Sequence, residues 1–195
     1  MKARLLLCAA CLTVVLAGIG ALAQGRIPTR FSGVIHDYSP LAGGTTAWEV
    51  RGPWSLDLND ETRTANFSAA LTMELSVLGQ TPANVQAVIL AQHTHHIAMK
   101  NATVTYNPTD CPPASATTPP YTAQIEIEGT ASVFANGSVA PFGQYSQLQV
   151  CLAGGIGEPN VPFSNVTLVF QKPAANHFGP QPIHGVVRKA NWLDE

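Results

Sequence analysis

Two long stretches of alternating apolar and polar residues constrain this chain more than any other feature. Apolar residues or glycine occupy every second position over residues 48–58, and apolar residues do so again over residues 65–77. A period of two places alternate side chains on opposite faces of a β-strand, whereas a helix needs a period of 3.6. The turn-forming residues 59–62 separate the two stretches. The pattern predicts a long β-hairpin with one buried face.

Similar but shorter patterns continue along the chain. Further strands are expected over residues 31–38, 85–99, 102–106, 121–133, 147–152, 165–171 and 183–188. We therefore predict a single all-β domain over residues 24–195, built as an antiparallel β-barrel of about eight strands. Closure into a barrel removes the exposed edges of such long strands, and a two-sheet β-sandwich is the alternative. Pro53 cannot donate to a sheet ladder, so we expect a sheet edge or a bulge at that position.

The first 23 residues have the layout of a secretory signal peptide. Lys2 and Arg4 precede an apolar run over residues 5–19, and Ala21 and Ala23 form a small-residue cleavage pattern. The run is shorter than the ~20 residues that a membrane-spanning helix needs. We expect cleavage after Ala23 and a secreted or periplasmic protein without a membrane span.

The cysteines fit this location. Of the four cysteines, only Cys111 and Cys151 lie outside the predicted signal peptide. Two cysteines in an exported chain predict one disulfide bond. This bond would tie the proline-rich segment 107–120 to the strand that carries Cys151.

The charge balance excludes one class of partner. Lys and Arg total 10, Asp and Glu total 12, and the basic residues do not cluster. Nucleic-acid binding requires a basic patch. We therefore expect the partner to be a small molecule or a metal ion, while the oligomeric state stays open.

Histidine is the residue type that suggests chemistry. Three of the six histidines, His93, His95 and His96, lie within four positions. On a strand, His93 and His95 point to the same side with Cα atoms about 6.5–7 Å apart, and His96 points to the other. Two neutral imidazoles at this spacing can chelate a divalent transition metal such as Zn or Cu.

Two more histidines flank a turn rich in glycine and proline near the end of the chain. His177 and His184 are separated by six residues, and either can complete a three-ligand site with His93 and His95. The candidate metal ligands are therefore His93, His95, His177 and His184. The alternative is that these histidines form hydrogen bonds in a polar pocket and hold no metal.

Three functions remain open from the sequence. The first is an exported barrel that binds a divalent metal or a small ligand at a site lined by histidines. The second is a metal-dependent enzyme, such as an isomerase, cyclase or oxygenase, that uses the same histidines. The third is a structural or interaction protein of the cell envelope. No catalytic residue can be assigned.

Several segments together resemble a group of exported bacterial hypothetical proteins of about this length. They include residues 54–56, 65–73, 93–96, 140–143, 177–179 and 182–185. The resemblance covers nearly all of the chain after the signal peptide. It implies export and no particular activity.

Overall fold

The structure is a computed structural model. It describes residues 29–40, 46–77, 92–113, 123–136, 138–140, 142–154, 164–179 and 181–191. The predicted signal peptide and the first part of the predicted strand 85–99 lie outside the described residues.

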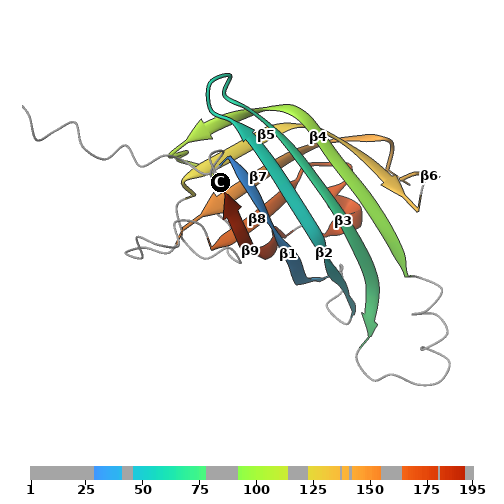
Figure 1. The fold of residues 1–195 in the computed structure, drawn as a ribbon. Helices are drawn as coiled ribbons and strands as arrows, with labels where there is room; N and C mark the ends of the chain where they lie inside the picture. Colours follow the sequence, from blue (N-terminus) through green and yellow to red (C-terminus); the bar gives the residue numbers. More distant parts are fainter. Residues whose placement is uncertain are drawn as a thin grey trace, which may run out of the picture.

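Antiparallel strands make up nearly all of the described chain. They are β1 (Arg30–Pro40), β2 (Thr46–Asn59), β3 (Thr64–Val77), β4 (His93–Tyr106), β5 (Ile125–Ala135), β6 (Ser138–Val139), β7 (Tyr145–Ala153), β8 (Asn165–Phe170) and β9 (Ile183–Asn191). Their order in the sheet is β4-β3-β2-β1-β9-β8-β7-β5-β6, and β4 also pairs with β5. The β4–β5 pairing closes the sheet into a barrel of eight strands, with β6 as a short addition to β5 (Figure 1).

Each barrel strand lies beside its neighbour in the sequence, and β9 returns to pair with β1. Such an up-and-down order needs only short connections between antiparallel strands. The predicted all-β fold and its barrel of about eight strands are therefore confirmed.

The alternation of the sequence becomes the inside and the outside of the barrel. Leu56 on β2 is 1% exposed and lies opposite Phe31 on β1 and Phe67 on β3, which are also buried. Its neighbour Ser55 is exposed on the outer face, where its Oγ is 2.8 Å from the Oγ of Ser68. One face of each strand thus fills the core.

The sequence divided the β4 region differently. We predicted separate strands at 85–99 and 102–106, but residues 93–106 form one strand. Asn101 adopts a left-handed backbone with φ of 52°, and the β4–β5 register shifts between Met99 and Thr103. A β-bulge therefore absorbs the polar residues that we interpreted as a break.

The prediction of a sheet edge or a bulge at Pro53 was also wrong. β2 is an inner strand of a closed barrel, between β1 and β3. Its pairing with β3 is interrupted between Arg51 and Trp54 without any change of register. A short gap in one ladder accommodates the missing N–H of Pro53, and neither an edge nor a register shift is needed.

One end of the barrel carries the short helix α3 (Ala175–Phe178) and is called the α3 end below. β2, β4, β7 and β9 begin there, and β1, β3, β5 and β8 end there. It lies to the right in Figure 1. Among the described residues, none of the helices is long and apolar enough to span a membrane.

Cys111 and Cys151 are joined by a disulfide bond on the outside of the barrel, across a sequence separation of 40 residues. Both side chains are buried and pack with Ala123. Closing a loop of this length restricts the unfolded chain, which the chain-entropy model values at about 4 kcal/mol. We therefore expect the double variant Cys111→Ser/Cys151→Ser to lose about this much unfolding free energy in a denaturant titration. Reductant should lower the stability of the wild-type protein alone; an equal effect on both proteins would contradict this account.

Candidate metal centre at the α3 end

Two histidines near the start of β4, His93 and His95, point into the mouth of the barrel. His93 lies opposite the buried Met73 of β3, and His95 lies opposite the buried Leu71. His95 is completely buried and His93 is half-buried. Both side chains therefore lie on the same face, as the spacing predicts, and the structure shows that this face is the inner one.

The third histidine comes from α3. His177 is followed by Phe178, which is completely buried and stacks on Phe170 with ring centroids 4.2 Å apart. Gly179 ends the helix with φ of 105°, and a Cβ there would lie 1.8 Å from the Oγ of Ser39. The buried Phe178 ring and this close approach, which only glycine permits, fix α3 across the barrel mouth.

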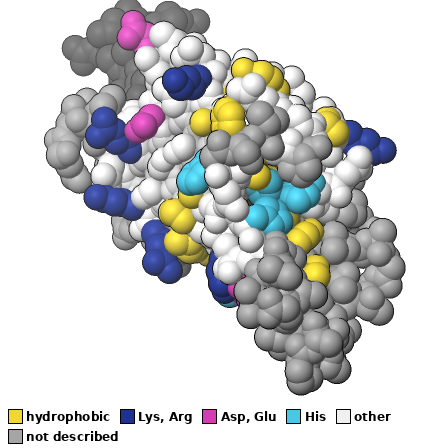
Figure 2. All heavy atoms as spheres, turned by 90° about the vertical axis from the view of Figure 1, so that its right-hand side faces the viewer, with side chains coloured by type: hydrophobic (Ala, Val, Ile, Leu, Met, Phe, Trp, Pro, Cys, Tyr) yellow, Lys and Arg dark blue, Asp and Glu magenta, His cyan; other side chains and the backbone are white. Residues whose placement is uncertain are grey.

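These elements bring three ring nitrogens together. The Nε2 of His177 lies 2.8 Å from the Nε2 of His95 and 3.0 Å from the Nε2 of His93. One ligand atom from each residue lies within 4.8 Å of the others. Figure 2 views the molecule from the α3 end, and histidine side chains gather near the centre of that view among hydrophobic side chains. We call His93, His95 and His177 the histidine trio.

The trio is chemically unusual because one nitrogen faces two others. An imidazole Nε2 carries either one hydrogen or one lone pair in the ring plane, so it forms one good hydrogen bond. His177 cannot satisfy both partners well in this way. A cation between the three nitrogens accepts all three lone pairs at once. With metal–nitrogen distances of about 2.0–2.1 Å, tetrahedral ligands lie about 3.3 Å apart, so small side-chain movements suffice.

Burial favours the neutral form of two members of the trio, His95 and His177. Burial, and to a smaller extent the electrostatic effect of His177, His93 and His96, lower the pKa of His95 to about 3. Burial and His93 also lower the pKa of His177. Imidazole must be neutral to bind a metal. At neutral pH, His95 and His177 are therefore in the ligating form.

Aromatic rings surround the trio. The Trp48 ring meets His93 edge-on at a centroid distance of 5.2 Å. Phe142 lies 5.5 Å from His177, and Phe178 lies 4.9 Å from His95. The Nδ1 of His95 is buried and has no hydrogen-bond partner among the described residues. Among the described residues, aromatic rings therefore line the site, and the imidazoles are its polar groups.

His184, the fourth candidate ligand, does not join the trio. The adjacent Ile183 is buried in the core, so alternation along β9 turns the His184 side chain to the other side. Its backbone N–H donates to Asp37 Oδ2 at 2.7 Å, and its Nδ1 lies 3.0 Å from the same oxygen. Because an ionised carboxylate only accepts, Nδ1 carries the hydrogen. His184 therefore connects β9 to β1.

Hydrogen bonds hold Asp37 in its ionised form. Burial by itself raises the pKa of this carboxyl, but the side-chain and backbone hydrogen bonds from His184 and the N–H of Tyr38 outweigh it. The resulting pKa lies below the ordinary value. A lowered carboxyl pKa stabilises the fold above the ordinary pKa, and this stability is lost as the pH falls through the folded pKa.

We expect Asp37→Asn to lower the unfolding free energy at pH 7 by about 1–3 kcal/mol, because charge-assisted hydrogen bonds become neutral ones. The loss relative to wild type should shrink below the ordinary carboxyl pKa. Urea titrations at pH 7 and pH 3 measure both effects. Asp57→Asn is the control. Asp57 forms an exposed ion pair with Arg30, so this substitution should change stability by less than about 1 kcal/mol. Equal losses in the two variants would refute the role of Asp37.

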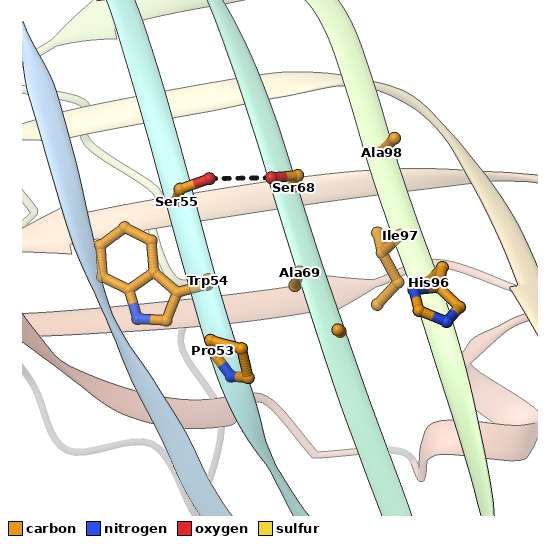
Figure 3. A pocket seen from close by; sticks show the side chains of 9 residues that line it. Pro53, Trp54, Ser55, Ser68, Ala69, His96, Ile97 and Ala98 are labelled. Carbon is orange, nitrogen blue, oxygen red and sulfur yellow. Dashed lines mark hydrogen bonds between the residues drawn. The ribbon is translucent and has the colours of Figure 1, made fainter.

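The remaining histidines lie on the outside. His36 is exposed and pairs with Glu49 at 3.1 Å. His96 is exposed on the outer face of β4, beside a shallow depression of about 400 Å³ that Ser55, Ser68 and Ala98 also line (Figure 3). The alternation therefore separates His96 from the trio, as the sequence predicts.

Sequence reasoning missed the aromatic shell and Asp37. Trp48 and Phe142 are only partly buried and pack against the core at the α3 end. Trp48 begins an alternating stretch and is indistinguishable there from a core residue. Phe142 lies in the connection between β6 and β7, where periodicity carries no information. The sequence pattern around Trp48 or Phe142 therefore does not mark either residue as part of a site, and only the fold shows it.

The fold and the site define a closed up-and-down β-barrel with a histidine trio at one mouth. Comparison with known proteins adds no relative, because no family model, no curated protein and no solved structure matches the chain. The resemblance to exported bacterial proteins stays a prediction.

Proposed function

We propose that this protein is an exported β-barrel that binds a divalent transition metal, Zn²⁺ or Cu²⁺, through His93, His95 and His177. The convergence of one ring nitrogen from each of the three histidines within 4.8 Å is the observation that carries the proposal. Imidazole nitrogen suits both metals well. Two ligands come from one strand and the third from a helix fixed by a buried aromatic ring, so the fold holds the set together.

The expected location has separate support. The signal peptide predicted over residues 1–23 and the disulfide between Cys111 and Cys151 both fit an oxidising compartment outside the cytosol. We therefore propose that the protein acts in the periplasm or outside the cell. Neutral His95 and His177 side chains allow metal binding there at neutral pH.

A metal-dependent enzyme is the second candidate. Three protein ligands leave at least one coordination position for water or substrate, as in catalytic zinc sites. A hydrolytic or isomerising enzyme also needs a positioned acid or base near the metal. Among the described residues, the group that could hold a metal ion consists of the three histidines and contains no Asp or Glu. This favours binding as the primary function.

Removal of single histidines tests the site. We expect purified protein to contain one metal per chain, and calorimetry at pH 7.5 to give micromolar or tighter binding of Zn²⁺ or Cu²⁺. Replacing His93, His95 or His177 by Ala should weaken binding by more than the ~10–100-fold that loss of an outer-shell partner costs. At pH 5.5, affinity should fall because protons compete for the imidazoles.

Two matched histidines serve as controls. His96→Ala removes an exposed histidine next in sequence to His95, and His184→Ala removes a ring that bonds to Asp37. Both variants should keep wild-type affinity. A wild-type protein without stoichiometric metal, or equal losses in all five variants, would end the metal proposal.

A further inference from the structure

We propose that the open coordination position of this metal takes a small aromatic anion with an oxygen donor, either a carboxylate carried on the ring or a phenolate. The inference rests on the proposed metal site and names its ligand class. It follows from two features of the α3 end: the charge that the metal centre would carry and the side chains that flank it.

The charge requires an anion. Three neutral imidazoles leave a divalent ion with its full charge of two. The ionisable side chains that shift the pKa values of His95 and His177 are other histidines. Among the described residues, the metal-binding group contains no Asp or Glu. A charge in a largely apolar site is unfavourable unless it is paired. An anionic oxygen ligand would supply the missing negative charge.

The flanking side chains favour an aromatic ring. Trp48 contacts two of the three histidines, with centroid distances of 5.2 Å to His93 and 6.2 Å to His177. Phe142 contacts His177 at 5.5 Å and His95 at 6.0 Å. His177 therefore lies in contact with both rings, and both are only partly buried. A ligand on the metal meets aromatic surface on either side.

The burial of the site residues indicates the side from which a ligand reaches the metal. His95 and Phe178 are completely buried and form its floor, whereas His93, His177, Trp48 and Phe142 keep some exposure. A ligand must therefore enter from the solvent side, past Trp48 and Phe142. Offset or edge-on contacts between aromatic rings 4.5–7 Å apart are favourable. An aliphatic anion such as acetate would pair with the charge of the metal but would not form these aromatic contacts.

Cobalt provides the probe for this ligand class. Co²⁺ takes the coordination of zinc and has visible absorption bands that change when a ligand binds. Co²⁺ alone is titrated into the full protein first, and benzoate, acetate and benzyl alcohol are then added separately. We expect benzoate to change the bands with a Kd about tenfold or more below that of acetate, as one or two aromatic contacts supply. Benzyl alcohol should bind more weakly than benzoate.

Variants at the walls test the contacts. Trp48→Ala and Phe142→Ala should each reduce the preference for benzoate over acetate to about threefold or less. Trp48→Phe should retain most of it. Tyr145→Ala removes a side chain that is 61% exposed on the strand β7 and should leave it unchanged. Trp48→Phe also guards against loss of folding, because it keeps an aromatic ring against His93.

The outcomes separate the two proposals. Absence of cobalt bands would overturn the metal site, and the ligand class with it. Cobalt binding with equal affinity for benzoate and acetate would overturn the ligand class and leave the metal site standing. Benzyl alcohol binding as tightly as benzoate would refute the need for an anion. A preference unchanged in both Trp48→Ala and Phe142→Ala would refute the role of these walls.

Discussion

Leu56→Asp should leave the barrel unfolded at room temperature, whereas Ser55→Asp should melt within a few degrees of the wild-type protein. Leu56 is 1% exposed between Phe31 and Phe67. A carboxylate there has no partner, and an unpaired buried charge costs several kcal/mol or forces protonation. Typical domains have only about 5–15 kcal/mol of unfolding free energy.

Ser55 is the matched control because it is the preceding residue on the same strand. It lies on the outer face opposite Ser32 and Ser68, and the substitution removes only its exposed hydrogen bond to Ser68. Surface changes of this kind cost about 0.5 kcal/mol. Circular dichroism with thermal melting measures both variants. Equal melting temperatures would mean that the strand faces are assigned to the wrong sides.

The alternation that underlies this test was also the most informative part of the sequence. It fixes which side chains share a face, so it predicts that His93 and His95 point to one side of the strand and His96 to the other. A period of two depends only on the backbone geometry of a strand and survives any arrangement of strands in space. Barrel closure follows less directly, from the length of the strands and the cost of open edges.

The third member of the trio shows where such reasoning stops. His177 and His184 looked equivalent in the sequence, since both flank the same turn. Their difference depends on tertiary contacts: Phe178 fits into the core beside Phe170 and carries His177 inward, while β9 pairing places His184 beside Asp37. Neither contact has a local pattern. The same holds for Phe142, whose connection has no periodicity.

Metal-free protein should lose stability in mild acid because of His95. Burial lowers the pKa of this histidine to about 3, whereas the unfolded chain has an ordinary imidazole pKa of about 6.5. Between these values the unfolded state binds one more proton than the folded state. Stability therefore falls as the pH drops from 6.5 towards 3. For one such group, linkage gives a loss of about 3 kcal/mol between pH 7 and pH 4.

His95→Leu isolates this contribution, because leucine fills a similar buried volume and does not titrate. Urea titrations of both proteins, with chelator present, should show a steeper fall in unfolding free energy for the wild type than for His95→Leu. His177 has a lowered pKa for the same reason, so some acid sensitivity should remain in the variant. Asp37 contributes only below the ordinary carboxyl pKa, outside most of this window. Parallel pH profiles for the two proteins would show that His95 is not held neutral by the fold, and this would weaken the argument that the trio is prepared for a metal.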